Sequence, residues 1–467
     1  MRQDHLARMR RGETLSWQQQ ILLTLRLSVP AILAQLSTIV MQYIDAAMVG
    51  QLGAGASAAI GLVSSSMWLF ADVATAMVVG FTVQVAQRIG AGDEAEARNL
   101  MRQGLVVTLA VSVVMMALAL AISGPLPRWL RGDPLIHADA SSYFRIFALS
   151  LPLVQLGALS AGMLQSSGNM RTPSVLMVSM CAMDVVFNAL LIFPGRTLLG
   201  VTVPGAGLGV TGAALGTLLA RGIGSLILTW FLLCRSPMLR LRRGERLRFV
   251  PHQLRLAARL SLPVAAERGV MSSAQIVSMR IIAPLGTVSV AAHSFAITAE
   301  GLCYMPGYGI QSAAATLVGQ SVGAGRKDLT HRLGWIITGL SMVIMTLSAA
   351  ILYVTAPLIL GIMTPDAEVV TLAASVLRIV IFVEPLFGAS IVATGVFQGA
   401  GNTLPATLMD LLSMWGLRIP LAIPLVARYG LRGAWIAMTV ELTFRGAIFL
   451  LRLAGRRWLP REQRGAQ

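Results

Sequence analysis

Twelve long apolar runs make up most of the sequence, and they restrict the fold more than any other feature. A helix needs about 20 mostly apolar residues to cross a bilayer. Only 12% of the residues are charged, whereas soluble domains carry roughly 25%, so the chain is predicted to be an all-α integral membrane protein with the lipid bilayer as a partner. The twelve predicted transmembrane helices are residues 21–49, 56–88, 103–123, 136–166, 173–194, 205–233, 254–282, 288–322, 333–361, 368–399, 405–427 and 431–451.

The loops between these runs alternate between basic and nearly uncharged. Residues 234–259 contain eight arginines, whereas the loops GQLGAGAS and MTPDAE contain no Lys or Arg. Because basic loops stay on the cytoplasmic side, both termini are expected in the cytoplasm of a bacterial-type inner membrane. This topology also explains the net charge of +17, so we expect no nucleic-acid partner.

Cysteine and histidine usage does not indicate a catalytic or metal centre. Cys181, Cys234 and Cys303 are scattered through apolar segments and suggest neither a disulfide framework nor a metal cluster. The five histidines are isolated. We therefore expect a monomer that is not an enzyme and has no cofactor beyond a coupling ion.

The two halves of the chain repeat with one constant offset of 233 residues. The seventh helix lies six positions, an even number, after the first, so the two repeats have the same orientation. Such parallel duplications are typical of transporters that rock two lobes around a central cavity. The matching segments are RLSVP (26–30) with RLSLP (259–263), LGAGASAA (52–59) with LGTVSVAA (285–292), and VAQRIGAG (85–92) with VGQSVGAG (318–325).

The repeat and the charge pattern together give a domain plan. Two parallel-repeat lobes of six helices each are expected, joined by an Arg-rich interfacial linker. The predicted segments are a cytoplasmic N-terminal segment (1–20), an N-lobe (21–233), the cytoplasmic linker (234–253), a C-lobe (254–451) and a cytoplasmic tail (452–467).

Several motifs in both halves resemble the multidrug and toxic compound extrusion (MATE) family. They are P-x4-Q-x9-D-x3-VG-x-LG in the first helix, VAQRIGAGD, LVGQSVGAGR, MLQSSGNMRTP, VFQGAGNTLP and WGLRIPLA. The resemblance covers about residues 20–455. It implies twelve helices in two lobes and export of cationic, amphiphilic small molecules in exchange for inward sodium ions or protons.

Three polar residues of the predicted N-lobe are candidates for cation coupling. An intramembrane charge costs about 2.5–3.5 kcal/mol on insertion scales, so it is expected to be functional or paired. Asp45 has no basic residue within four positions, and Asp184 and Asn188 share one helix face. The family places an Asn and an acid one turn apart here, and this chain has them in swapped order. Sodium at these three residues is the only metal considered, and a structural hydrogen-bond cluster is the alternative.

The predicted C-lobe offers less clear candidates. Some sodium-coupled family members carry acids where this chain has Met271 and Phe387. Glu267 and Glu384 lie close by in sequence and are possible substitutes, although Glu267 has Arg268 beside it and an ion pair is the alternative.

Two further acids are candidates for a cavity. Asp72 and Glu300 lie near the middle of their predicted helices, where a charge facing lipid would be costly.

The function predicted is a cation-coupled antiporter, driven by protons or sodium, that exports organic cations. Protons are favoured because acids are missing at Met271 and Phe387. A lipid-linked precursor flippase of the same superfamily is the first alternative and requires a strongly cationic cavity. A membrane-embedded enzyme is the second and requires clustered His, Asp or Glu ligands, which the sequence lacks.

Overall fold

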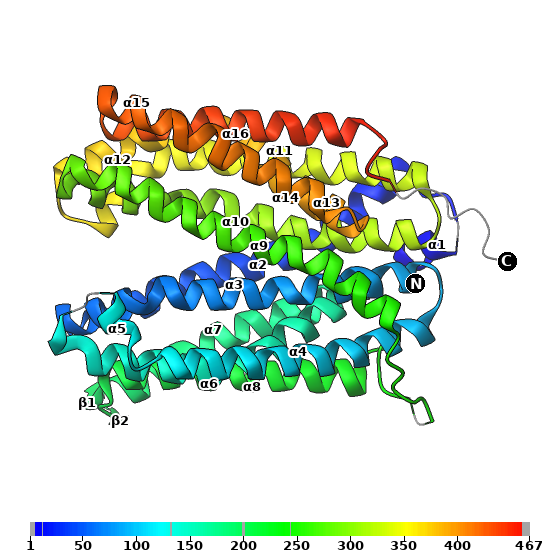
Figure 1. Ribbon diagram of the computed structural model, residues 1–467, viewed down its shortest axis with the longest axis horizontal. Coiled ribbons are helices and arrows are strands. Elements are labelled where there is room, and N and C mark those ends of the chain that lie inside the picture. The colour runs from blue at the N-terminus through cyan, green and yellow to red at the C-terminus, as the bar shows by residue number, and fades with distance from the viewer. Residues whose placement is uncertain (1–4, 12, 131–132, 199–200, 243, 460–467) are drawn as a thin grey trace. The chain divides into compact units, whose positions relative to one another are not determined.

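The computed structural model describes residues 5–11, 13–130, 133–198, 201–242 and 244–459. Across these residues, all twelve predicted spans are helical (Figure 1), so the predicted fold class is confirmed. The spans of the first half are α2 (Trp17–Gly50), α3 (Ala54–Gly90), α4 (Glu94–Ile122), α6 (His137–Ser166), α7 (Arg171–Ile192) and α8 (Gly209–Trp230). The spans of the second half are α9 (Pro251–Ile282), α10 (Thr287–Gly323), α11 (Lys327–Met363), α12 with α13 (Ala367–Val380 and Glu384–Gly399), α14 with α15 (Thr403–Leu411 and Ile419–Tyr429) and α16 (Leu431–Ala454). Short helical segments are α1 (His5–Arg10), α5 (Leu126–Trp129), η1 (Pro134–Ile136), η2 (Phe231–Arg235), η3 (Ala283–Leu285), η4 (Ile381–Val383) and η5 (Leu412–Arg418).

Two of the twelve spans are less apolar than the rest. Ten helical segments of the described chain are long and apolar enough to cross a membrane by length and composition, and α9 and α10 are the two that are not among them. The first carries several charged residues, and the second contains Glu300, two tyrosines and many small polar residues. Polar groups are tolerated at membrane depth where they face protein or a cavity rather than lipid, and Glu267, Arg268 and Glu300 of these two helices line a cavity.

The chain forms two compact units whose boundaries cut three helices. The N-unit consists of Ser37–Val85 and Glu94–Ala265, and the C-unit consists of Met1–Leu36, Ala86–Asp93 and Ala266–Gln467. Helices α2, α3 and α9 therefore contribute residues to both units, whereas the predicted lobes kept whole helices together. Within the N-unit, α8 packs against α6 and α7, and within the C-unit α10 packs against α11 and α13.

Turns at equivalent positions of the two halves have the same backbone conformation. Three pairs of glycines at equivalent positions of the repeat have positive φ angles: 103° and 95° at Gly53 and Gly286, 80° and 71° at Gly92 and Gly325, and 91° and 77° at Gly168 and Gly401. Only glycine adopts such angles without strain. The repeated GAG and GN sequences are thus tight turns that end helices at equivalent places.

Proline interrupts two spans of the second half. The 3₁₀ segment η4 separates α12 from α13 just before Pro385, and the π-helical segment η5 separates α14 from α15 just before Pro420. A proline lacks the N–H of the helical ladder and clashes with the preceding turn, so the helix must loosen there. Glu384 directly follows the first of these breaks, and Arg418 is the last residue of the second.

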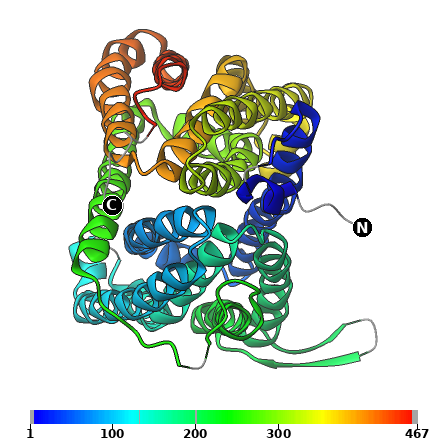
Figure 2. The same cartoon turned by 90° about the vertical axis from the view of Figure 1, so that its right-hand side faces the viewer.

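Two elements were not predicted. A hairpin of β1 (Pro194–Leu198) and β2 (Val201–Ala206) lies between α7 and α8 and extends away from the helices of its unit (Figure 2). At the N-terminus, α1 packs on α10, where Arg10 Nε donates to Gln320 Oε1 at 3.0 Å. The predicted segment 1–20 is therefore partly helical, and residues 1–4 and 12 lie outside the described residues.

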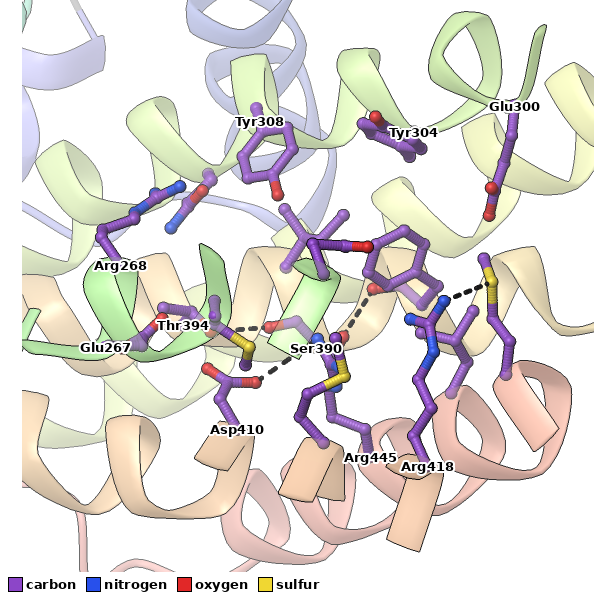
Figure 3. A pocket seen from close by; sticks show the side chains of 18 of the residues that line it. Glu267, Arg268, Glu300, Tyr304, Tyr308, Ser390, Thr394, Asp410, Arg418 and Arg445 are labelled. Atoms are coloured by element: carbon purple, nitrogen blue, oxygen red, sulfur yellow. Dashed lines mark hydrogen bonds and ion pairs between the residues drawn. The ribbon is translucent and has the colours of Figure 1, made fainter. Parts of the chain in front are cut away.

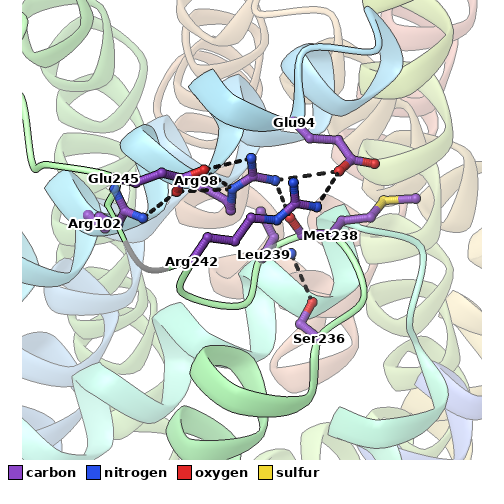
Figure 4. Close-up of polar contacts among 8 residues, drawn as sticks. All are labelled: Glu94, Arg98, Arg102, Ser236, Met238, Leu239, Arg242 and Glu245. Atoms are coloured by element: carbon purple, nitrogen blue, oxygen red, sulfur yellow. Dashed lines mark hydrogen bonds and ion pairs between the residues drawn. The ribbon is translucent and has the colours of Figure 1, made fainter.

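The linker is fastened to α4 (Figure 4). Arg98 Nε donates to Glu245 Oε1 at 2.9 Å, and Arg102 also pairs with this carboxylate. The backbone of Arg248 exchanges two hydrogen bonds of 3.1 Å with the Asn99 side chain. The hydrogen bond from Arg98 is the chief cause that lowers the pKa of Glu245 below its usual value. Residues 236–242 and 244–250, which we call the linker strap, are therefore held against α4, and Arg243 lies outside the described residues.

Candidate functional site

The N-unit contains a cavity of about 460 Å³ between α2, α3, α6 and α8. Its wall is mostly apolar and aromatic, and Asp45 and Arg221 are its charged members. Ligand pockets in proteins combine an apolar lining with a few placed polar groups in this way. Asp45 is thus open to a ligand rather than enclosed in the helix packing.

Asp45, Asp184 and Asn188 form one cluster. Asn188 Nδ2 donates to Asp45 Oδ1 at 2.9 Å and to Asp184 Oδ2 at 3.2 Å. Asp184 and Asn188 are fully buried, with 0% and 1% of their surfaces exposed. One amide nitrogen therefore joins a carboxylate at the cavity wall to a second carboxylate behind it.

Helix α8 leaves room for this amide through Gly216. A methyl group placed on Gly216 would lie 2.1 Å from Asn188 Oδ1, far inside van der Waals contact. The oxygen of the Asn188 amide therefore packs against α8, while its nitrogen faces the two acids. Asn188 Oδ1 and Asp184 Oδ1 are buried without a hydrogen-bond partner within the described part of the chain.

Arg221 and Tyr143 line the same cavity as Asp45 and were not predicted. Arg221 lies in the middle of the apolar helix α8. A basic residue at that depth is as costly as an acid, and this was the available signal. Most arginines were interpreted as markers of topology, and Arg221 was passed over although it lies inside a span.

The C-unit contains a second cavity of about 230 Å³ (Figure 3). Charges of both signs line it: the acids Glu267, Glu300 and Asp410 and the bases Arg268, Arg418 and Arg445. Tyr304 and Tyr308 of α10 face the same space. The predicted candidates Glu267 and Glu300 thus share one cavity, although they come from different helices.

Most of these charges have partners. Glu267 accepts a hydrogen bond from Thr407 Oγ1 at 2.8 Å. Arg445 Nε donates to Glu441 Oε1 at 2.6 Å, and Arg445 lies 3.7 Å from Asp410. This three-membered ion network joins α14 to α16, so Arg445 fixes the helices that form one wall of the cavity.

Glu384 and Asp72 do not line either cavity. Glu384 is completely buried behind the wall and interacts with Glu300. Both of its carboxylate oxygens, and Oε1 of Glu300, lack a hydrogen-bond partner among the described residues. Asp72 is partly exposed on α3 and is not one of the residues that line the N-unit cavity.

A family profile, MatE, matches residues 30–190 and 263–423. The second match is displaced from the first by the same offset as the internal repeat, and together the matches cover more than half of the chain. The chain belongs to the MatE family. It is therefore a multi-pass membrane transporter, as its sequence motifs predicted, and not an enzyme.

Curated relatives of this MatE chain match it over nearly its whole length. A probable multidrug resistance protein NorM from Thermotoga maritima is 28% identical over 445 residues, which are 94% of this chain and 93% of the relative. The multidrug resistance protein PmpM from Pseudomonas aeruginosa is 25% identical over 94% of this chain and 93% of its own length.

Solved structures share the fold. A crystal structure of MATE in complex with MaL6 has a TM-score of 0.87 at 21% identity and covers 96% of this chain and 98% of its own. A MOP superfamily transporter from Pyrococcus furiosus, described as having a binding pocket of reversed polarity, has a TM-score of 0.87 at 20% identity with the same coverage. At this identity the likeness concerns the fold alone.

Proposed function

We propose that this chain exports organic cations and multiple drugs across the inner membrane by alternating access, in exchange for protons. The observation that supports this most is the pair of acids that Asn188 joins at the wall of the N-unit cavity. The names of the NorM and PmpM relatives, which are multidrug resistance proteins, agree with it. Both termini are proposed to lie in the cytoplasm, and the transporter is proposed to act as a monomer.

The Asn188 amide favours a proton over sodium at this cluster. Sodium is a hard cation that seeks several oxygen ligands. Asn188 presents its nitrogen to both acids and packs its oxygen against Gly216, so it adds a donor rather than a ligand between them. Two neighbouring carboxylates in a desolvated site repel each other, which favours a proton on one of them.

The charges of the cavities favour an exporter of cations over the flippase alternative. A flippase for an anionic lipid precursor requires an excess of positive charge around its substrate. The N-unit cavity has one acid and one base, and the C-unit cavity has three of each. Neither lining is strongly cationic.

Coupling follows from competition for the acid pair. A drug cation bound near Asp45 favours the deprotonated cluster, and by linkage protonation weakens drug binding by the same factor. Proton uptake from the outer side then promotes release of the drug there. Exchange of one proton for one monovalent drug cation moves no net charge, so the pH gradient is the driving force, and the membrane potential, worth about 2.3 kcal/mol per charge per 100 mV, contributes only where more than one proton enters per drug.

Dye efflux with separately imposed gradients tests the proposed coupling. Inverted vesicles containing the transporter receive a proton gradient or a sodium gradient at a fixed membrane potential, and accumulation of a fluorescent cation is followed. We expect the proton gradient alone to drive transport, with no gain from sodium. Transport that requires sodium at fixed pH and potential would contradict proton coupling and make the same cluster a sodium site.

A further inference from the structure

Arg418 is a buried cation that the proposed function does not use. It ends the π-helical segment η5, only 8% of its surface is exposed, and it lines the C-unit cavity. Its guanidinium donates to the thioether sulfur of Met438 at 3.0 Å. Sulfur of this kind is a weak acceptor, so the contact is a poor substitute for a carboxylate, and the guanidinium faces the cavity.

Arg418 makes no direct contact with a carboxylate of the described residues, although Glu441 and Glu300 favour its positive charge from a longer distance. Arg445 forms ion pairs with Glu441 and Asp410. Glu267 accepts a hydrogen bond from Thr407. Arg418 has no ion pair with a carboxylate of the described chain. A buried charge without a partner is strongly destabilising, so a cavity that keeps one is built for a ligand that supplies the missing charge.

Glu300 is the matching group on the other side of the cavity. It projects from α10, whereas Arg418 projects from η5, and Figure 3 shows the two side chains reaching into the cavity from opposite sides. Glu300 is 2% exposed, its Oε1 has no partner among the described residues, and Glu384 adds a second acid behind it. An acid and a base thus face one cavity and attract each other across it without forming a direct ion pair.

We propose that the C-unit cavity is a binding site for a compact zwitterion, whose anionic group is held by Arg418 and whose ammonium group is held by Glu300. A carboxylate matches the planar fork of a guanidinium and takes two parallel hydrogen bonds. The ammonium end lies beside Tyr304, which is in edge contact with Tyr308 and Phe387, and aromatic rings attract cations. The volume of about 230 Å³ limits the ligand to a small molecule.

The site is particular to the second half of the chain. By the offset of the internal repeat, Arg418 corresponds to Val185 and Glu300 corresponds to Met67. The duplicated scaffold therefore folds in the first half without either charge. This argues that the pair serves a ligand of the C-unit rather than the folding of the repeat.

Binding of acids and their esters to the purified transporter tests the proposal. The probes are ω-amino acids of three to seven carbons and 4-(aminomethyl)benzoic acid, each beside its methyl ester, which keeps the ammonium group and removes the carboxylate. Calorimetry gives the dissociation constants. At least one acid is expected to bind about tenfold more tightly than its ester, because the ester leaves Arg418 unpaired.

Variants assign the preference to Arg418. Arg418→Met should bind the acid and the ester equally, with ester affinity unchanged, and Arg418→Lys should restore part of the preference. Glu300→Gln should weaken both probes, because both carry the ammonium group. Arg378→Met is the matched control, since Arg378 belongs to the same unit but lies outside the cavity over the ring of Tyr353.

The outcomes separate this site from proton coupling. Equal binding of every acid and its ester to the wild type, or a preference that survives in Arg418→Met, would overturn the proposal. If Arg418→Met does not fold, the wild-type comparison and Arg418→Lys still decide. A clear acid preference together with sodium-driven efflux would reject proton coupling and leave the zwitterion site standing.

Discussion

Asn188 decides how the two acids of the N-unit behave. It donates to both Asp45 and Asp184 through one nitrogen, so a single amide holds the two carboxylates close together. Asp45 is the member that reaches the cavity, and Asp184 is enclosed. At the scale of the residue, this makes Asp45 the group that meets the ligand and Asp184 the group that modifies its charge.

Asp45→Asn is expected to fold and to reach the membrane but to lose drug efflux about tenfold or more. The variant keeps the size and hydrogen-bonding capacity of the side chain and removes the charge that exchanges a proton for the drug. Efflux of a fluorescent cation from cells, corrected for protein level, measures this. Asp139→Asn, outside the cavity in the first turn of α6, is the control and should transport normally. Normal efflux by Asp45→Asn would exclude Asp45 from coupling.

Helix α8 contributes to the cluster of Asp45, Asp184 and Asn188 through Gly216, because a glycine leaves space for the Asn188 amide. Gly216 is the point of α8 that touches the Asn188 amide. Replacing this glycine by alanine changes no charge. Any change in transport would therefore report the position of the Asn188 side chain and not the charge of the site.

Gly216→Ala is expected to lower efflux several-fold, because the new methyl group must displace the Asn188 side chain. Gly222→Ala on the same helix is the matched control, since its methyl group would meet only the flexible Leu153 side chain at 3.3 Å. Parallel efflux assays at equal protein level measure the difference. Equal activity of the two variants would show that the position of Asn188 does not matter.

The linker strap is held to α4 by a charged group, Glu245, whose ionisation depends on pH. Arg98 and Arg102 hold Glu245 against α4, and the pKa of this carboxyl is lowered, chiefly by the Arg98 hydrogen bond. A carboxyl with a lowered folded-state pKa stabilises the protein above its unfolded pKa of about 4.3, and this contribution disappears as the pH falls through the folded value.

Glu245→Gln is expected to lower the melting temperature by about 1–2 °C at pH 7, because the loss of about 1 kcal/mol is a small part of the unfolding entropy of a chain this long. Below about pH 4 the melting temperatures of the variant and the wild type should converge, because the wild-type carboxyl is then protonated as well. Tryptophan fluorescence during heating of the purified protein measures both. Glu368→Gln, at an exposed position of α12 outside the strap, is the control. A Glu245→Gln deficit that stays constant down to pH 3 would argue against a charged strap.

At the scale of the whole molecule, the duplication made most of the fold predictable. The apolar runs located all twelve spans because a helix in lipid must satisfy its backbone internally. The glycines of the repeated turns matched in conformation, since the sequence there leaves few choices. The hairpin was missed because its strands are only five and six residues long, lie between two apolar runs and are too short to give a membrane signal of their own.

The two candidate sites were less predictable from the sequence than the fold. Acids inside apolar runs are conspicuous, so Asp45, Asp184, Glu267 and Glu300 were found from sequence. Which charges pair depends on packing between distant helices, as the contacts of Glu267 with Thr407 and of Arg445 with Asp410 illustrate. Arg221 and Arg418 were missed because basic residues were interpreted mainly as evidence of topology, and Arg418 was noted only as part of the WGLRIPLA motif.

The parallel orientation of the halves predicts that equivalent turns face the same side of the membrane. Gly92 and Gly325 have positive φ angles, so labels are better placed on their neighbours. In a background without Cys181, Cys234 and Cys303, Ala91→Cys and Ala324→Cys should both react with an impermeant maleimide only from the cytoplasmic side. Gln51→Cys, at the other end of α3, should react from the outer side. Labelling of the two alanine sites from opposite faces would refute the parallel duplication.

The central claim is that a drug cation and a proton compete for the acid pair, and proton release on binding measures this most directly. A cationic drug is titrated into the purified transporter in weakly buffered solution, and the protons released per bound drug are counted at several pH values. The wild type should release a substantial fraction of one proton per drug near neutral pH, and Asp45→Asn should release none. Drug binding without proton release, or release that persists unchanged in Asp45→Asn, would contradict the account.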